Sequence, residues 1–366
     1  MSDGPFRITD YMRRYDFENV VLCNDNSTGL RAVIAIHDTT LGPAAGGCRM
    51  WTYATEWDAV EDALRLGRGM TYKYAAAGVD LGGGKAVIIG DPRKDKSEGL
   101  FRSMGRFVER LGGLYYTGED VGTTLADMEA MHRETSFVIT LPEYLGGAGP
   151  IAGATACGVI EGMRVAVRRV TGSDSLAGLT VGVQGLGAVG SELVPRLAGL
   201  DAKLVVCDVD PDRVGTLRGL EGVSVVDAEQ IYRTPMDVFA PCALGGILND
   251  VTIPQLTCKV VAGCANNQLR TETDGVEIER RGIVYAPDYI INAGGTVYDT
   301  DRLFGGTHVH DRALAKVRRI EETTRRVFEL AEKEGIPSFR AADRLAERRI
   351  AEVARAKGLR TRGGVP

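Results

Sequence analysis

Two lysines within a run of small residues are the first candidates for chemistry in this chain. Lys73 and Lys85 lie twelve residues apart in the segment MTYKYAAAGVDLGGGK, and three glycines directly precede the second lysine. Glycine lets a backbone turn freely and lets a ligand approach closely. An ammonium group in such a half-buried wall loses hydration, which favours the neutral amine, and a second ammonium adds to this effect. The pair is a candidate for substrate binding and proton transfer, and a surface lysine beside a strand turn is the alternative.

A carboxylate and two amides can complete a site of this kind. Asp120 lies in the segment TGEDVG, and Asn266 is followed directly by Asn267. Two ammonium groups, a carboxylate and amides in one site suit an amino acid substrate. One lysine can bind the α-carboxylate, the other can act as a base, and the carboxylate can exchange a proton with the amine.

A glycine-rich turn is the second candidate site. Residues 180–184 have a strand pattern, and a G-x-G-x-x-G motif follows them at the start of an apolar helix. Gly185 allows a tight turn, Gly187 allows close approach of a pyrophosphate, and Gly190 allows close packing of the helix on the strand. Asp208 ends the next strand, where a carboxylate can bind both ribose hydroxyls, and Asp210 adds a charge that disfavours a 2′-phosphate. The motif predicts NAD over NADP, a preference that Arg213 can soften, and an ordinary glycine turn is the alternative.

The surrounding patterns predict an α/β protein with two domains. The first part is mixed α/β, with strands near 20–23 and 32–36 and a helix near 56–70. The lysine segment then leads into a strand at 86–89, and residues 115–124 have a loop-like composition. From residue 179 the pattern changes to βαβ alternation, which predicts a parallel sheet of the Rossmann type. The glycine-rich stretch 146–150 is the predicted hinge.

Composition excludes several classes of function. The chain has 366 residues, 44% hydrophobic and 25% charged, which is typical of a globular protein with more than one core. Its formal charge of -5 makes nucleic acid an unfavourable partner. Seven cysteines without a C-x-x-C pair indicate reduced thiols and a cytoplasmic protein. No apolar run has the length of a membrane span, and the pair His308 and His310 lacks a third ligand, so we expect neither membrane nor metal binding.

Longer motifs across nearly the whole chain resemble the leucine/phenylalanine/valine dehydrogenase group of the glutamate dehydrogenase superfamily. Leucine dehydrogenases are the most similar in overall sequence. The motifs are IHDTTLGPAAGG, RMWTY, MTYK, LGGGK, VIIGDPRKDK, TGEDVGTT, VQGLGAVG, FAPCALGG, ANNQL, YAPDYIINAGG and EGIPSFRAADRLAERRI.

This resemblance implies a role for each candidate residue. Lys73 would hold the substrate carboxylate, Lys85 would activate the water that attacks the imine, and Asp120 would carry a proton to and from the nitrogen. Gly46 and Gly47 would line the substrate cleft, and Thr155 would lie near the nicotinamide amide. Asn266 and Asn267 would contact the nicotinamide ribose or the substrate.

The resemblance also implies the reaction and the architecture. The enzymes carry out reversible NAD-dependent oxidative deamination of an L-amino acid to its 2-oxo acid and ammonia, without a catalytic metal. An N-terminal domain that binds substrate and forms oligomers, from dimers to octamers, would span residues 1–142 and include the C-terminal helix 338–366. A Rossmann-type NAD-binding domain would span residues 143–337.

Several residues depart from the leucine dehydrogenase pattern. Leucine usually occupies the position of Ala45, and alanine usually occupies that of Gly118. Both changes remove volume and predict room for an aromatic or bulky side chain, although a methylene is worth only about 1–3 kcal/mol of discrimination. Tyr74 also replaces a usually small or amide residue.

A second departure is polar. Thr296 and Asp299 occupy positions that are aliphatic in the family and would touch the substrate side chain. A carboxylate against an apolar side chain is costly unless it has a partner. Asp299 therefore either turns away or pairs with a neighbour such as Arg302, or it meets a donor or cation on the substrate.

The predicted protein is an NAD-dependent L-amino acid dehydrogenase for a branched-chain or aromatic substrate of the leucine, valine or phenylalanine type. One alternative is the same chemistry on a bulkier or polar amino acid, such as tryptophan, tyrosine or a basic residue. Another is a non-catalytic sensor of NAD or amino acids, and the presence of both Lys85 and Asp120 argues against it.

Overall fold

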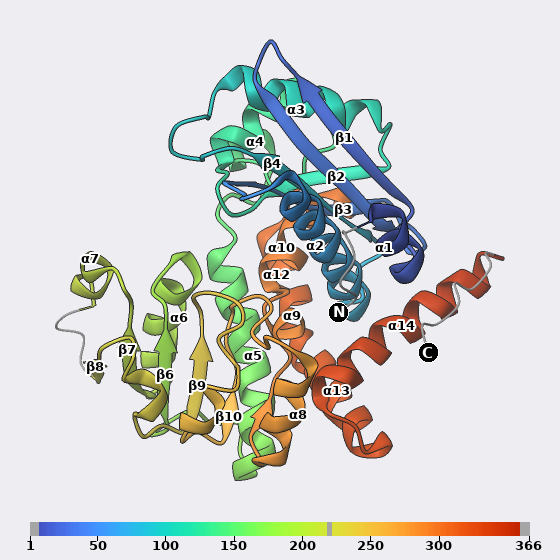
Figure 1. Cartoon of the computed structure of the whole chain (residues 1–366). Helices are drawn as coiled ribbons and strands as arrows, with labels where there is room; N and C mark the ends of the chain where they lie inside the picture. Colours follow the sequence, from blue (N-terminus) through green and yellow to red (C-terminus); the bar gives the residue numbers. More distant parts are fainter. Residues whose placement is uncertain (1–6, 218–221, 359–366) are drawn as a thin grey trace. The chain divides into compact units, whose positions relative to one another are not determined.

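Two separate sheets organise the chain, one in each of the two units into which it divides (Figure 1). The structure is a computed structural model that describes residues 7–217 and 222–358. Unit 1 comprises residues 1–149, 299–309 and 346–366, and unit 2 comprises residues 150–298 and 310–345. The predicted fold class, a mixed α/β unit followed by a unit with a parallel sheet, is confirmed.

Unit 1 contains a five-stranded sheet in the order β1-β2-β4-β3-β5. The strands β1 and β2 are antiparallel, as are β2 and β4, whereas β3 runs parallel to both β4 and β5. Its elements are α1 (Ile8–Tyr15), β1 (Asn19–Asp25), β2 (Leu30–Asp38), β3 (Ala44–Trp51), α2 (Glu56–Ala76), β4 (Gly82–Ile89), α3 (Glu98–Arg110), β5 (Tyr115–Glu119), α4 (Leu125–His132), η1 (Glu143–Leu145) and α11 (Asp301–Gly305).

Helices cover both faces of this sheet (Figure 1). On one face α3 and α4 pack over the apolar residues Ile34, Ile36 and Ile88. On the other face Ala63 and Leu64 of α2 pack over the neighbouring strand positions. Because side chains alternate along a strand, each strand sends successive residues to opposite faces.

The helix α2 is longer than the sequence pattern indicated. It begins at a capping box in which the Thr55 hydroxyl accepts from the backbone of Asp58 and the Asp58 side chain accepts in return, an arrangement that satisfies helix N–H groups. It continues to Ala76 rather than ending near residue 70, because Tyr74 and Ala75 are also buried. Lys73 therefore lies within the last turn of α2.

The three glycines before Lys85 are strand residues rather than a flexible turn. They form the start of β4 and are paired with β2 and β3, which corrects the expected strand at 86–89. A Cβ atom at Gly83 would lie 2.1 Å from both the backbone nitrogen and the hydroxyl of Thr71, and one at Gly82 would lie 1.9 Å from the Asp38 carbonyl oxygen. Their function is to let neighbouring backbone approach closely.

The segment 115–124 was expected to be a loop, and its first half is instead a strand. β5 pairs with β3 so that Gly118 lies opposite Gly47. Tyr115 is buried, and its hydroxyl donates to the Gly46 carbonyl oxygen at 2.7 Å. Asp120 directly follows this strand and is thereby held close to β3.

Unit 2 contains a six-stranded sheet in the order β11-β10-β9-β6-β7-β8, with parallel pairing throughout. Its elements are α5 (Ala152–Thr171), β6 (Thr180–Gln184), α6 (Ala188–Ala198), β7 (Lys203–Cys207), α7 (Pro211–Gly215), β8 (Val223–Val225), η2 (Ile231–Arg233), β9 (Val238–Pro241), η3 (Ile253–Gln255), β10 (Val260–Val261), α8 (Glu272–Arg280), β11 (Val284–Tyr285), α9 (Asp288–Ile291), α10 (Gly294–Asp299), α12 (His310–Arg318) and α13 (Ile320–Glu334).

The C-terminal part differs from the expected limits. The charged residues from His310 to Glu334 form two helices, α12 and α13, which are separated at Arg319. The last helix, α14 (Ser338–Ala356), contributes residues 338–345 to unit 2 and its remainder to unit 1. Residues 299–309 also belong to unit 1, although the chain on both sides belongs to unit 2.

Replacing Gly83 with alanine should destabilise the protein by about 3 kcal/mol, because the new methyl group would overlap the Thr71 backbone. The matched control is Gly69→Ala on the exposed side of α2, where a Cβ meets no atom within 4 Å. That variant should gain up to about 1 kcal/mol from helix propensity. Urea unfolding of both variants tests this, and equal stabilities would contradict the close-packing role.

Candidate active site

Three charged side chains, Lys85, Asp120 and Arg49, interact with one another where three adjacent strands of unit 1 lie side by side. Lys85 on β4 places its Nζ atom 2.9 Å from Oδ2 of Asp120, and Arg49 on β3 donates from Nε to the same oxygen at 3.0 Å. The Lys85 side chain is 6% exposed, and those of Asp120 and Arg49 are each 18% exposed. The structure therefore brings together the two residues, Lys85 and Asp120, that the sequence singled out for proton transfer.

Electrostatics keep the Asp120 carboxyl ionised. Burial would raise its pKa, but the charges and hydrogen bonds of Lys85 and Arg49 outweigh that effect and lower the pKa of Asp120. The backbone nitrogen of Asp120 donates to the Thr123 hydroxyl at 3.0 Å, and that hydroxyl donates to the Cys48 carbonyl oxygen at 2.9 Å. These contacts fix the carboxylate relative to β3.

Arg49 is a site residue that sequence reasoning missed. Its Nη1 atom lies 2.9 Å from Asp62 on α2, which also accepts from the Tyr53 hydroxyl at 2.7 Å and from Arg65 at 3.0 Å. Strand alternation could have found it, because Arg49 lies two residues after Gly47 and shares its face of β3. The network links α2 to the charge of Asp120.

Gly46 and Gly47 leave no room for a side chain. A Cβ at Gly46 would lie 1.9 Å from the Gly84 carbonyl oxygen, and a Cβ at Gly47 would lie 2.7 Å from Cβ of Asp120. Any larger residue at position 47 would displace the carboxylate that pairs with Lys85. These glycines thus bring β3 against the candidate catalytic residues.

Lys73 is half-buried on the last turn of α2, the helix that packs against β2 and β4. The next residue, Tyr74, is 2% exposed and packs with Ala45, Leu81 and Ile139. The large Tyr74 side chain therefore occupies space beside the small Ala45 side chain, which is itself fully buried. This packing does not support the expectation that Ala45 adds room for a substrate.

The space beside Gly118, where a side chain would otherwise lie, is occupied by the Thr140 hydroxyl. A Cβ at Gly118 would lie 2.7 Å from the Thr140 hydroxyl oxygen. That hydroxyl accepts from the backbone nitrogen of Glu119 at 3.1 Å and donates to Oδ2 of Asp299 at 2.5 Å. Gly118 and Asp299, which departed separately from the family pattern, are thus connected through Thr140.

Asp299 is 5% exposed, and burial raises its pKa to about 7, although Thr140 and Arg302 act to lower it. Arg302 donates to the carbonyl oxygens of Ile139 and Val138 and influences Asp299 through its charge. One carboxylate oxygen, Oδ2, pairs with Thr140 rather than with Arg302, and a contact of Asp299 with the substrate stays a prediction. The other oxygen, Oδ1, has no hydrogen-bond partner among the described residues.

The glycine turn in unit 2 has a geometry that suits a dinucleotide. Gly185 has a φ of 99°, a conformation that favours glycine, and a Cβ at Gly190 would lie 2.0 Å from the Gly185 carbonyl oxygen. At Gly187, the N-cap of α6, Arg213 is the one described residue that a Cβ would meet within 4 Å. The space in front of the α6 N-terminus therefore fits the pyrophosphate of NAD.

Asp208 at the end of β7 also orders this turn. Its Oδ2 atom accepts from the backbone nitrogen of Leu186 at 2.6 Å, and Oδ1 accepts from that of Asp210 at 2.8 Å. Arg213 lies 3.8 Å from Asp208 and 3.3 Å from Asp210. Each carboxylate oxygen can accept a second hydrogen bond, so these contacts leave capacity for ribose hydroxyls.

The other predicted cofactor residues also lie in unit 2. Thr155 is on the first turn of α5, and a Cβ at Gly295 would lie 2.3 Å from its hydroxyl oxygen. Thr296 follows on α10 and is half-buried. Asn266 accepts from Asn292 at 2.9 Å, and the exposed Asn267 has a φ of 52°.

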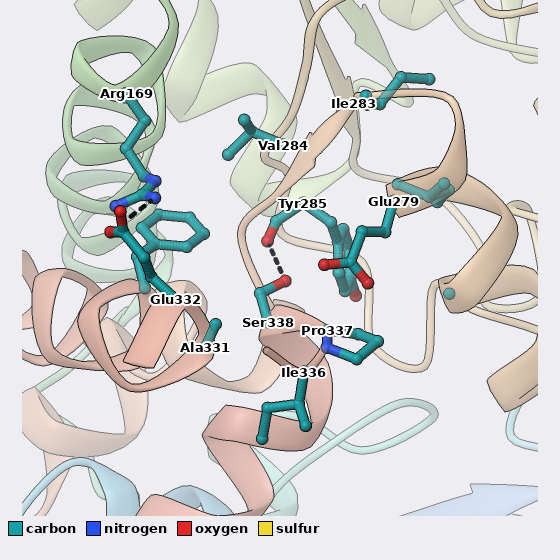
Figure 2. Close-up of a pocket in the computed structure, with 14 residues that line it drawn as sticks. Arg169, Glu279, Ile283, Val284, Tyr285, Ala331, Glu332, Ile336, Pro337 and Ser338 are labelled. Carbon is teal, nitrogen blue, oxygen red and sulfur yellow. Dashed lines mark hydrogen bonds and ion pairs between the residues drawn. The ribbon is translucent and has the colours of Figure 1, made fainter. Parts of the chain in front are cut away.

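A cavity of about 290 Å³ lies elsewhere in unit 2, lined by residues of α5, α8, β11, α13 and the start of α14 (Figure 2). Polar groups in its wall pair with each other, as Arg169 does with Glu332 at 3.2 Å and the Ser338 hydroxyl does with the Tyr285 carbonyl oxygen at 2.6 Å. None of the residues predicted to act in catalysis or cofactor binding lines this cavity.

Neither a metal-binding cluster nor a membrane-spanning helix is present in residues 7–217 and 222–358. No group of three or more His, Cys, Asp or Glu side chains is arranged to hold a metal ion. His310 instead shares a hydrogen bond of 2.7 Å with the Tyr298 hydroxyl. No helix in the described ranges combines the length and apolar character needed to cross a membrane.

The parallel sheet of unit 2, its glycine turn and the acid after β7 are typical of a dinucleotide-binding protein. Residues 16–137 match the model of the Glu/Leu/Phe/Val dehydrogenase dimerisation domain, and residues 146–358 match that of the glutamate/leucine/phenylalanine/valine dehydrogenases. The chain belongs to the Glu/Leu/Phe/Val dehydrogenase family and is an NAD-dependent amino acid dehydrogenase. The resemblance predicted from the sequence is confirmed.

Individual relatives agree over nearly the full length. A leucine dehydrogenase of Thermoactinomyces intermedius is 53% identical over 94% of this chain and 93% of its own. A phenylalanine dehydrogenase of Bacillus thermotolerans is 47% identical over 96% of this chain and 92% of its own. The crystal structure of an L-tryptophan dehydrogenase from Nostoc punctiforme is 41% identical, covers 95% of this chain and 99% of its own, and has a TM-score of 0.81.

The raised pKa of Asp299 predicts a pH-dependent stability. Because the folded protein holds this proton up to about pH 7 and the unfolded chain releases it near 3.8, stability falls as pH rises between these values. The stability difference between Asp299→Asn and wild type should therefore favour the variant by up to about 3 kcal/mol more at pH 8 than at pH 4.5.

Chemical unfolding at the two pH values measures this difference, with the exposed Asp250→Asn as the control that should show none. A stability difference between Asp299→Asn and wild type that is the same at both pH values would contradict the raised pKa.

Proposed function

We propose that this enzyme catalyses reversible NAD-dependent oxidative deamination of a branched-chain or aromatic L-amino acid, giving the 2-oxo acid and ammonia. The observation that carries the proposal is the buried contact of 2.9 Å between Lys85 and Asp120, which joins a base and a proton carrier within one site. The names of the relatives, leucine and phenylalanine dehydrogenases, support the substrate class. In this reaction the partners are the amino acid or 2-oxo acid and ammonia.

Each unit 1 residue has a distinct task in this reaction. The Lys73 ammonium binds the substrate α-carboxylate. Bound NAD would supply the acceptor for the hydride of Cα, and a neutral amine that loses this hydride becomes an iminium ion. Lys85 first passes its proton to the Asp120 carboxylate, and the neutral amine then takes a proton from the water that attacks the iminium carbon. Asp120 transfers the proton it received to the nitrogen, and the hydroxyl proton is released as the carbonyl forms and ammonia leaves. The distance between Lys85 and Asp120 permits direct proton exchange.

Residues of unit 2 bind the cofactor. The turn at Gly185, Gly187 and Gly190 receives the pyrophosphate at the N-terminus of α6, and Asp208 binds the adenosine ribose. Thr155 contacts the nicotinamide amide, and Asn266 and Asn267 contact the nicotinamide ribose or the substrate. The support for this placement is the open space in front of Gly187 and the position of Asp208 beside the turn.

Further properties follow from the family. We infer a homo-oligomer, since residues 16–137 match a domain described as a dimerisation domain. Reduced thiols suit a cytoplasmic enzyme, and no disulfide joins the seven cysteines, all of which lie in the described residues. We infer a substrate-binding domain of residues 1–142 joined by the C-terminal segment 338–366, of which 359–366 lie outside the described residues, and an NAD-binding domain of residues 143–337.

A second candidate is the same chemistry on a bulkier or polar side chain. The buried carboxylate of Asp299 favours it, because an aliphatic substrate offers that group no partner. The likeness to an L-tryptophan dehydrogenase of Nostoc punctiforme also favours it.

A panel of L-amino acids tests the proposal through NADH formation. Wild type should oxidise at least one of leucine, valine, phenylalanine, tyrosine and tryptophan, and Lys85→Ala should lower kcat by at least about a hundredfold because the base is lost. NAD binding, measured by fluorescence titration, should persist in this variant.

The matched control is Lys94→Ala, which removes a lysine side chain that is 80% exposed and should leave turnover unchanged. No NADH from any substrate would overturn the proposed function, and near-normal activity of Lys85→Ala would overturn the role of Lys85.

A further inference from the structure

Asp299 has an unusual combination of burial and incomplete bonding. It is 5% exposed, its Oδ2 atom accepts from Thr140, and its Oδ1 atom has no hydrogen-bond partner within the described ranges. A buried polar atom without a partner costs about 1–3 kcal/mol, and more when the group is charged. Such a cost is expected where a ligand supplies the missing hydrogen bond.

The neighbours of Asp299 place it beside the proposed substrate site. Thr140, its hydrogen-bond partner, lies against Gly118, two residues before Asp120. Tyr74, whose pKa is raised by burial and by the charge of Asp299, directly follows Lys73. All these residues belong to unit 1, so this arrangement depends on that unit alone.

The surrounding charges favour a neutral donor as the missing partner. Arg302 lies close enough to lower the pKa of Asp299, and its guanidinium is held by the carbonyl oxygens of Val138 and Ile139. Arg302 therefore already supplies a positive charge, and Glu119 is the acidic neighbour whose charge raises the pKa of Asp299. An ammonium group on the substrate would be repelled by the Arg302 guanidinium. A neutral N–H or O–H group could donate a hydrogen bond to Asp299 without this repulsion.

Distance along β5 limits the length of the substrate side chain. Asp120, the residue proposed to contact the substrate nitrogen, lies two residues beyond Gly118, which corresponds to about 7 Å along a strand. Thr140 and Asp299 extend from the Gly118 position. A donor near the α-carbon, such as the hydroxyl of serine or threonine, is too short to span this length, whereas indole and phenol groups carry theirs at the far end.

We propose that Asp299 is a specificity-determining residue whose Oδ1 accepts a hydrogen bond from a neutral donor at the end of an aromatic substrate side chain. This proposal rests on the proposed function and narrows its substrate class to tryptophan or tyrosine. Gly118 leaves space for the Thr140 hydroxyl, and that hydroxyl orients Asp299 by bridging it to the backbone of Glu119.

Matched substrate pairs isolate this hydrogen bond. The pairs are tyrosine with phenylalanine and tryptophan with 1-methyltryptophan, assayed as kcat/KM at pH 9, where Asp299 is ionised. In at least one pair, wild type should prefer the donor-bearing member by about tenfold to a hundredfold, as expected for a hydrogen bond to a charged group. Asp299→Val should reduce that ratio to within about threefold, because valine accepts no hydrogen bond.

Thr140→Val provides a second variant if Asp299→Val does not fold. It removes the hydroxyl that orients Asp299 and should lower the same ratio, whereas a purely structural role would lower kcat/KM for both members equally. Asp250→Asn, at an exposed surface position, is the control and should retain the wild-type ratio.

The outcomes separate the two proposals. Turnover without a preference for the donor-bearing member in wild type, or with an unchanged ratio in the variants, overturns the role of Asp299 and leaves the dehydrogenase function intact. Absence of NADH formation from every amino acid overturns both.

Discussion

The ion pair between Lys85 and Asp120 is the interaction that the architecture of unit 1 is arranged to hold. Burying two charges costs several kcal/mol for each ion, and the cost is offset only when the geometry is good and further hydrogen bonds are present. Arg49 supplies a second positive charge at 3.0 Å, and Thr123 fixes the backbone of Asp120. The strand order β4-β3-β5 places these side chains next to each other, although their residues are far apart in the sequence.

Absence of side chains is as important to this site as their presence. Gly47 allows Asp120 to approach β3, Gly83 allows α2 to approach β4, and Gly118 allows the Thr140 hydroxyl to reach its partners. Each of these contacts would be lost to a single methyl group. In the proposed reaction such closeness fixes the distances over which protons move, so small residues contribute to catalysis through position.

The pocket residues act in pairs rather than singly. Tyr74 packs against Ala45, so a large residue on α2 fills the space beside a small residue on β3. Gly118 and Asp299 are joined through Thr140 in the same way. A comparison of single positions with the family pattern does not show that Tyr74 shares the buried cluster of Ala45 or that Thr140 bonds to Asp299. The room for substrate at Ala45 stays a prediction.

Much of this organisation was predictable from the sequence, because it depends on local pattern. The βαβ alternation and the spacing of Gly185, Gly187 and Asp208 identified the dinucleotide fold and NAD. The sequence did not reveal that Gly83 belongs to a strand, since a glycine run is typical of turns, and only packing against Thr71 explains it. The Thr140–Asp299 contact joins residues 159 positions apart, and local sequence carries no signal for such a pairing.

The pH dependence of kcat/KM in an Arg49→Gln variant tests the central claim most directly. Because the Arg49 charge helps to lower the pKa of Asp120, its removal should raise that pKa and move the acidic limb of the profile to higher pH. Arg65→Gln, which removes a contact to Asp62 but not to Asp120, should leave the limb in place. An unchanged acidic limb in Arg49→Gln would contradict the claim that the Arg49, Lys85 and Asp120 network controls proton transfer.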